Sequence, residues 1–171
     1  MATTNILNYL ETTGKSVTTG ADTQLGTAPL NRLQTETFLT ETAITAGQLV
    51  AVDAAKIATD ASGGLTAATV ITADFNSAPV RKIVVGVAAE SVTGTALAPA
   101  FIKVIVRGPA TAVPLATVGC AVGDPVVLDT AGGTGACMVN TAANIGHVIG
   151  YALETIAAAG PLKIYVLKNG I

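Results

Sequence analysis

Three short motifs occur twice along this chain of 171 residues, in the same order each time. They read G-x-x-V-x-[V/L]-D, [V/I]-G-x-A-x-E-[S/T] and K-[V/I]-x-V, first at residues 47–53, 85–91 and 103–106 and then at residues 123–129, 149–155 and 163–166. The spacings shrink in the second copy, which is typical of loops that vary around strands that persist. Two copies are too few for a solenoid. We therefore expect two similar three-strand units that close into one compact β-barrel or sandwich, because closure removes exposed sheet edges.

The composition favours an all-β fold. Half of the residues are apolar, and 18 glycines punctuate the chain, many of them between short apolar runs, as in a many-stranded, turn-rich protein. No window of ten or more residues makes a convincing amphipathic helix. Because low complexity inflates such matches, chance convergence of Val-, Ala- and Gly-rich strands is the alternative explanation of the repeat. The predicted strands cover residues 48–53, 82–89, 101–107, 125–129, 137–140, 147–153 and 163–167.

Alternation within these segments separates a buried face from an exposed one. Lys103 and Arg107 alternate with Val104 and Val106, which is the period-2 signature of a half-buried strand. The same reasoning over both copies of the repeat predicts the core. Its members should include Val50, Val52, Val85, Val87, Val104, Val106, Val126, Leu128, Ile149, Ala152, Ile164 and Val166.

Residues 1–42 differ from the rest of the chain. They are crowded with Thr, Asn and Gln and show no sustained period of 2 or 3.6. Such a segment cannot bury enough surface to order itself, so we interpret it as an extended N-terminal arm before a β domain of residues 43–171; a floppy tail is the alternative. On the arm hypothesis, deleting residues 1–40 leaves the β domain folded but weakens attachment to a partner. The isolated apolar residues expected to anchor the arm are Tyr9, Leu10, Leu30, Leu33 and Phe38.

Charge and hydropathy exclude several classes of partner. The formal net charge is −2 and the nine basic residues are scattered, whereas binding to phosphate backbones needs a clustered basic surface. No apolar stretch resembles a membrane-spanning helix, and residues 1–10 lack the basic and apolar regions of a signal peptide. We therefore expect neither a nucleic-acid nor a membrane partner, and a protein that is made and used without secretion.

The sequence lacks the groups of side chains that catalysis or metal binding requires. The single histidine, His147, lies beside apolar residues and is expected to be structural rather than a general base. Cys120 and Cys137 lack the spacing of a zinc site or a disulfide framework and are interpreted as buried hydrophobes. Asp53 and Asp129 could supply a calcium site or an acid–base pair, but an Asp that follows a strand is typical of turns. We expect no catalytic residue, cofactor, metal or small-molecule substrate.

The segments that carry the repeat also resemble a known family. "TAGQLVAVD", "VVGVAAES", "IKVIVRGPATAVPLA", "VGDPVVLD", "IGYALET" and "PLKIYVL" are similar to segments of the small decoration, cement or head-stabilising proteins of tailed bacteriophages. The resemblance covers residues of about 43 to 168 and leaves the arm outside it. It implies a compact β domain without catalytic residues. It also implies trimers or other small oligomers that sit on the outer capsid surface and clamp adjacent major capsid subunits.

The predicted function is therefore that of a structural virion protein that binds and stabilises a phage capsid and is made in the host cytoplasm. Its expected partners are the major capsid protein and further copies of itself, most simply in a homotrimer. The alternative is a receptor- or carbohydrate-binding β module of a phage fibre or cell surface. Such modules present exposed aromatic side chains that stack on sugars. This chain has three Phe, three Tyr and no Trp, and glycan binding by the isolated domain would favour the alternative.

Overall fold

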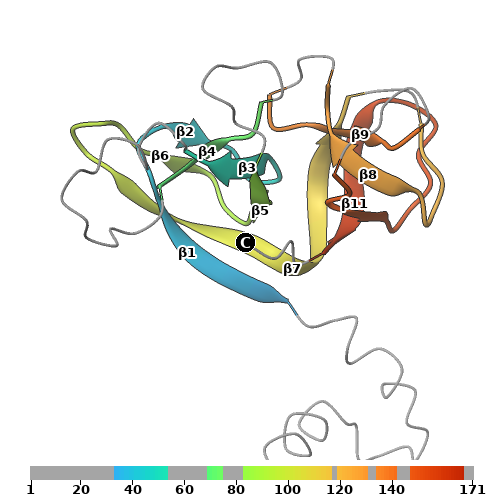
Figure 1. The fold of residues 1–171 in the computed structure, drawn as a ribbon, viewed down its shortest axis with the longest axis horizontal. Coiled ribbons are helices and arrows are strands. Elements are labelled where there is room, and N and C mark those ends of the chain that lie inside the picture. Colours follow the sequence, from blue (N-terminus) through green and yellow to red (C-terminus); the bar gives the residue numbers. More distant parts are fainter. Residues whose placement is uncertain are drawn as a thin grey trace, which may run out of the picture. The chain divides into compact units, whose positions relative to one another are not determined.

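The structure is a computed structural model that describes residues 33–53, 69–74, 83–116, 119–130, 134–141 and 147–167. The chain divides into residues 1–32, which lie outside the described part, and residues 33–171. Every helix or strand element among the described residues is a β-strand (Figure 1), so the all-β prediction is confirmed. The strands are β1 (Gln34–Thr40), β2 (Ala43–Ile44), β3 (Leu49–Val52), β4 (Thr69–Thr72), β5 (Val84–Ala88), β6 (Val92–Thr93), β7 (Ala100–Leu115), β8 (Pro125–Leu128), β9 (Cys137–Val139), β10 (Gly150–Ala152) and β11 (Gly160–Val166).

One sheet of nine strands closes on itself twice. Its order is β1-β4-β3-β5-β7-β11-β10-β8-β9, and β7 also pairs with both end strands, β1 and β9. The sheet therefore forms two closed rings that share β7. We call β1, β4, β3, β5 and residues 100–107 the first ring, and residues 108–115 with β11, β10, β8 and β9 the second ring. Each copy of the repeat thus closes a small barrel of its own, with two strands more than its three motifs predicted.

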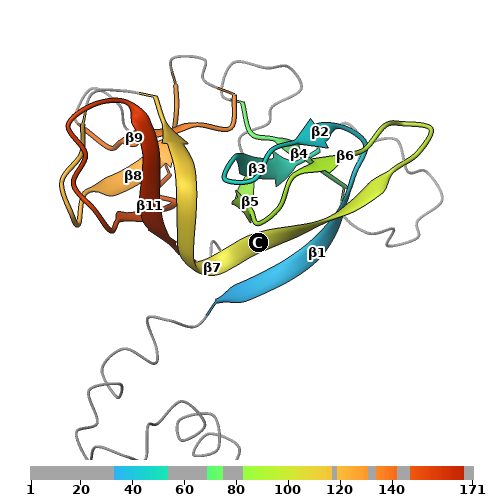
Figure 2. The same cartoon turned by 180° about the vertical axis from the view of Figure 1, so that it is seen from behind.

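The strand β7 serves both rings. Residues 100–107 pair with β1, whereas residues 108–115 pair with β11, and Figures 1 and 2 show these neighbours along its two halves. The sequence prediction ended this strand at Arg107, because Gly108 and Pro109 are residues that commonly end or interrupt strands. The strand continues because Gly108 adopts a φ of 113°, which glycine takes at little cost, and this allows the backbone to pass from one ring into the other.

The strand pairing confirms the internal repeat. In the first ring, β3 lies antiparallel between β4 and β5, and in the second, β8 lies antiparallel between β9 and β10. The strand β1 is parallel to β4 and antiparallel to β7, just as the second half of β7 is parallel to β9 and antiparallel to β11. Agreement in both order and direction excludes a chance match of low-complexity segments.

Individual hydrogen bonds repeat as well. The Ala88 N–H donates to the Gln48 carbonyl at 2.9 Å, and at the equivalent place the Ala152 N–H donates to the Asp124 carbonyl at 2.9 Å. The hydroxyl that ends the second motif also has one role in both copies. Ser91 Oγ accepts from the Ala46 N–H at 2.9 Å, and Thr155 Oγ1 accepts from the Val122 N–H at 3.2 Å.

Each ring is filled by side chains from equivalent positions. The core of the first ring is Ile44, Val50, Val52, Val70, Val85, Ala88, Ile102, Val104 and Val106. The repeat places Cys120, Val126, Leu128, Cys137, Ile149, Ala152, Leu162, Ile164 and Val166 at the same positions of the second ring, and all are buried. Burying one Val, Leu or Ile side chain contributes about 1.5–3 kcal/mol. Every core residue predicted from the sequence is buried.

The two rings also pack against each other, through an outward face of the first ring. Leu49, Val87 and Ile105 lie opposite one another on β3, β5 and β7. They alternate with the inward-facing valines and are nevertheless buried, in one cluster with the interior of the second ring. Backbone hydrogen bonds join the rings here, because the Leu49 N–H donates to the Gly135 carbonyl at 2.8 Å and the Gly135 N–H to the Ala73 carbonyl at 2.7 Å.

The start of the β domain corrects the boundary expected at residue 43. The strand β1, assigned above to the arm, pairs with β7 from Gln34 to Thr40 and closes the first ring. Phe38 packs against the core of that ring, so this residue does not run away from its own domain. The prediction failed here because β1 is mostly Thr, Gln and Glu, and it contributes ladder hydrogen bonds rather than a period-2 apolar face.

Two truncations test this boundary. Removing residues 1–32 retains every described strand, and we expect the melting temperature measured by circular dichroism to change little. Removing residues 1–40 also deletes β1 and leaves β4 and β7 with unpaired edges, so we expect the first ring to unfold. Equal melting temperatures for the two truncated proteins would show that β1 is dispensable.

A matched pair of glycines tests the packing between the rings. Gly47 and Gly123 begin the two copies of the first motif, with φ of 87° and 90°. A Cβ on Gly47 would lie 2.3 Å from the Ala112 carbonyl oxygen, whereas a Cβ on Gly123 would meet no atom within 4 Å. Both changes to alanine incur left-handed strain. Only Gly47→Ala also forces the rings apart, so urea unfolding should show it to be the more destabilising by about 1–3 kcal/mol.

Candidate functional site

The described residues contain no group of three or more His, Cys, Asp and Glu side chains placed to hold a metal ion. Cys120 and Cys137 are free thiols buried in the second ring, as expected. Burial raises the pKa of both thiols, that of Cys137 to about 12, so neither has the thiolate character of a nucleophile. His147 is exposed. In the same part of the chain, no helix is long and apolar enough to cross a membrane.

The two aspartates that end the first motifs do not form one site. Asp53 and Asp129 occupy equivalent positions in different rings, each at the end of a strand. The Asp53 N–H donates to the Thr69 carbonyl at 2.9 Å, and the Asp129 N–H donates to the Ala136 carbonyl at 3.0 Å. Their repetition follows from the repetition of the strand end, which supports the structural interpretation.

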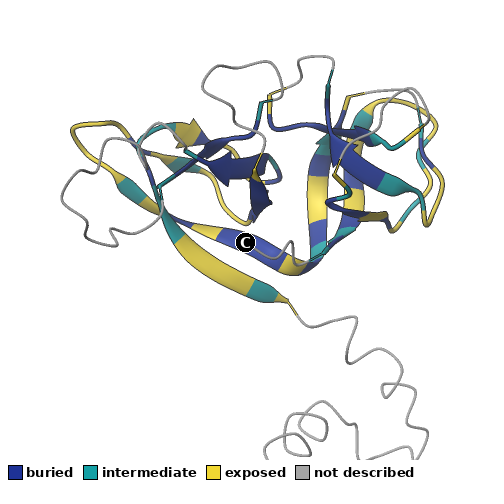
Figure 3. Cartoon of the chain, viewed as in Figure 1, coloured by how far each residue is buried: buried dark blue, intermediate teal, exposed yellow. Residues whose placement is uncertain are grey.

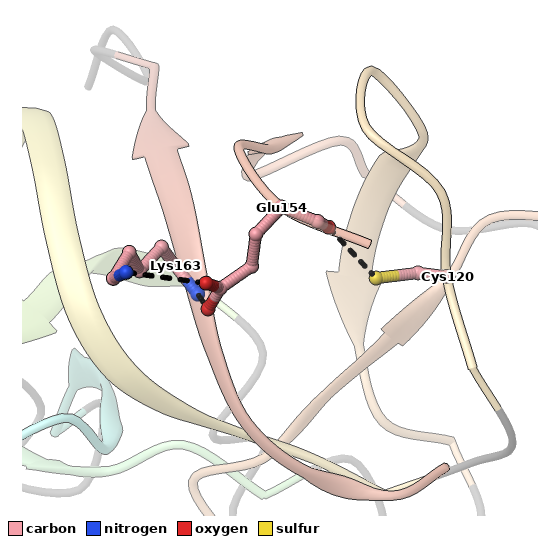
Figure 4. Close-up of polar contacts among 3 residues, drawn as sticks. All are labelled: Cys120, Glu154 and Lys163. Carbon is pink, nitrogen blue, oxygen red and sulfur yellow. Dashed lines mark hydrogen bonds and ion pairs between the residues drawn. The ribbon is translucent and has the colours of Figure 1, made fainter. Parts of the chain in front are cut away.

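The glutamate of the second motif also has a structural role (Figure 4). Glu154 Oε1 accepts from the Lys163 N–H at 2.8 Å, and its Oε2 lies 3.2 Å from Lys163 Nζ. These hydrogen bonds and the nearby ammonium lower the pKa of Glu154. Glu90 repeats the contact in the first ring by accepting from the Lys103 N–H at 3.1 Å. Each carboxylate therefore fixes the turn after its strand to the neighbouring strand of the same ring.

The remaining candidates for function are exposed apolar side chains. Figure 3 shows exposed residues in the loops and, alternating with buried ones, along strands such as β7. Large exposed apolar residues on a folded domain mark binding surfaces when they gather in patches. The large apolar residues that are exposed here are Leu33, Ile83, Leu97, Phe101, Val122, Tyr151 and Leu153.

The connection from β6 to β7 carries the most exposed of these. Thr95 and Ala98 bond to each other through both backbone N–H groups, each at 3.1 Å, and Thr95 Oγ1 accepts a further bond at 3.1 Å. This fixed turn presents Leu97, which is 99% exposed, and Phe101 follows at the start of β7 with 68% exposure. We call Leu97 and Phe101 the hairpin surface. The equivalent connection of the second ring, residues 156–160, is shorter and has no such turn.

The second ring has its own exposed apolar group. The Gly123 N–H donates to the Ala152 carbonyl at 2.9 Å, which places Val122 beside the segment that carries Tyr151 and Leu153. All three side chains are exposed, Tyr151 by 43%. The sequence prediction placed Tyr151 in a strand but gave no indication of which face it occupies.

The arm anchors predicted from the sequence have different outcomes. Tyr9, Leu10 and Leu30 lie outside the described residues. Leu33 is 54% exposed at the start of the domain, whereas Phe38 belongs largely to the first ring. The hairpin surface was missed, although Phe101 falls in period with Lys103 and Arg107, which lie on the exposed face of β7. That alternation was the signal available for Phe101, and no pattern distinguished Leu97 in its loop.

Comparison with known proteins supplies a fold. No family model matches the sequence, and no curated protein matches it. Among solved structures, the chain is similar to the crystal structure of the N base of the head fiber gp8.5 of bacteriophage phi29, with a TM-score of 0.50 and 15% sequence identity. The match covers 82% of this chain and 98% of that chain. At this identity the similarity establishes a shared fold.

The thiol chemistry gives a direct check on this part of the structure. With their pKa values raised, Cys120 and Cys137 should remain protonated and shielded at pH 8. We expect an aromatic disulfide reagent to label neither thiol in the folded protein and both after unfolding in guanidinium chloride. Rapid labelling of the native protein would show that the second ring opens readily.

Proposed function

We propose that this protein is a structural component of a bacteriophage virion that binds the outer surface of the capsid and stabilises it by clamping neighbouring major capsid subunits. The observation that carries the proposal is the shared fold with the base of a phage head fibre over nearly the whole of that base. The motif series that resembles capsid decoration proteins supports the same assignment. On this proposal the protein is not an enzyme and uses no cofactor or small-molecule substrate.

The architecture suits a role in which shape and contact area matter more than chemistry. Two closed rings joined by one strand make a frame in which the carboxylates of Glu90 and Glu154 fix turns to neighbouring strands. The hairpin surface projects a leucine on a turn fixed by three hydrogen bonds, and such preorganisation lowers the entropic cost of binding. We propose that it inserts into an apolar depression of the major capsid protein.

Clamping also requires more than one contact for each copy. Several weak contacts made at once add through effective concentration, and a homotrimer would multiply them further. Residues 1–32 would supply additional contacts through Tyr9, Leu10 and Leu30, with the exposed Leu33 at their junction with the domain. A segment of this composition gains order only on a partner's surface.

A second candidate function is supported by two exposed aromatic side chains. Phe101 and Tyr151 are 68% and 43% exposed, and exposed aromatics are the stacking surfaces of receptor- and carbohydrate-binding modules. These two side chains lie on different parts of the domain, because Phe101 belongs to the first ring and Tyr151 to the second. Binding to a glycan array by the isolated domain would favour this function over capsid attachment.

The test of the main proposal is cosedimentation with capsids of the encoding phage assembled without this protein. Wild-type protein should bind and should raise the temperature at which the capsids disrupt. Leu97→Asp should weaken binding at least tenfold, because a charge would have to enter an apolar contact. Ala96→Asp is the matched control, since it places the same charge on the neighbouring exposed residue of the same turn. Equal loss in both variants, or no binding by the wild type, would contradict the proposal.

A further inference from the structure

Four residues form a row across the outside of the second ring. Pro125 of β8 lies opposite Tyr151 of β10, Tyr151 opposite Tyr165 of β11, and Tyr165 opposite Pro109 of β7. Directly opposed residues share one face of a sheet, so the four side chains lie side by side. Tyr151 is exposed and the other three are half-buried. We call these residues the tyrosine row.

The first ring has an equivalent row, and there it is covered. The repeat aligns Pro125, Tyr151 and Tyr165 with Leu49, Val87 and Ile105. Those three residues are 0%, 1% and 9% exposed, because the second ring packs on them. In the first ring, this face therefore forms the contact with the second ring. The second copy of the face has no third ring to cover it within the described part of the chain.

The open row of the second ring differs from the covered row of the first ring in that its residues are suited to contact with water when no partner is bound. Tyrosine replaces valine and isoleucine, and it combines an aromatic body that is well suited to interfaces with a hydroxyl that stays hydrated when the face is free. Proline replaces Leu49, whose N–H donates to the Gly135 carbonyl in the covered contact. Pro125 has no N–H to satisfy, so the open face leaves no backbone donor unpaired there. These substitutions fit a contact that forms between separate molecules.

The surface that covers the first ring also has an uncovered counterpart. Two parts of the second ring cover it. One is Gly135, whose carbonyl accepts from the Leu49 N–H, and the other is the part of β7 around Ala112, whose carbonyl oxygen lies next to Gly47. The strand that corresponds to this half of β7 in the first ring is β1, and its residues Thr35, Glu36 and Thr37 are exposed. Each chain thus has one uncovered tyrosine row on its second ring. It also has one uncovered strand, β1, on its first ring, which we call the covering strand because its equivalent in the second ring covers a row.

From these two open surfaces we infer that the tyrosine row binds β1 of a second copy of this chain. The second ring of one copy then contacts the first ring of the next copy. This rests on the self-association in the proposed function and names the face that mediates it. A contact between unlike faces is heterologous, and it closes into a ring of copies when the rotation allows. We expect side chains to make this contact. Thr35, Glu36 and Thr37 of β1 pair with β7 in regular register and lack the positive φ of 58° that Ala112 adopts, and the space at Gly123 stays open.

Sedimentation velocity over a concentration series tests the face. The wild type should be oligomeric, and Tyr151→Asp should raise the dissociation constant at least tenfold. Tyr151→Phe keeps the aromatic body and should change it little, while Leu97→Asp, on the hairpin surface, should not change it. Circular dichroism confirms that each variant is folded. A wild type that is monomeric free and on capsids, or a Tyr151→Asp variant as oligomeric as the wild type, overturns the inference.

A mixing experiment tests the pairing of unlike faces. Thr37→Asp alters the covering strand, and Tyr151→Asp alters the row, so each variant alone should be monomeric. Mixed in equal amounts, they should form a heterodimer and no larger species, because one intact row then meets one intact β1. Failure to form the heterodimer overturns the pairing of these two faces.

Capsid cosedimentation of the same variants separates this inference from the proposed function. If Tyr151→Asp keeps the wild-type oligomer but loses capsid binding, the row binds the capsid rather than a second copy, and the inference is wrong while the proposed function stands. If the variants dissociate as expected but the wild type does not bind capsids, the inference stands and the proposed function fails.

Discussion

The use of β7 by both rings is the constraint on which the rest of the structure depends. Each ring closes only because β7 pairs with its first and its last strand. Without that strand, both rings would be open sheets of short strands with unpaired edges, and short, small sheets of this kind are weakly stable. The sharing also fixes where the rings meet, since the second half of β7 carries Ala112 to the place where Gly47 leaves room for its carbonyl.

Much of the fold could be predicted from the sequence, and the failures have physical reasons. The motifs marked β3, β5, β8, β10 and β11 because these strands put Val, Ile and Ala into ring interiors. The strand β1 left no such mark, since it closes a ring mainly through backbone hydrogen bonds that any residue with an N–H can make. The length of β7 was hidden because Gly108 and Pro109 predict an end to a strand, and nothing local shows that a second ring continues it.

The candidate surfaces were harder to predict than the fold. The alternation around Phe101 indicated that its aromatic side chain is exposed. The same alternation predicts an exposed side chain at Ile105, but Ile105 is buried by the second ring. Whether an outward apolar side chain is free depends on which neighbour packs over it, and that is a property of the tertiary structure. Val87 and Tyr151 occupy equivalent positions of the two rings, yet Val87 is buried and Tyr151 is exposed because the second ring packs on the first.

The passage of one strand through both rings also determines how the domain bears tension. In an antiparallel ladder the hydrogen bonds run perpendicular to the strands, so a pull along β7 loads the bonds of each half together in shear. Two rings joined by a flexible linker would instead swing apart and peel open one bond at a time. Forced unfolding is governed by the rate of unfolding rather than by equilibrium stability. The shared strand therefore favours a long mechanical lifetime, which is the property that a tie between two anchored points requires.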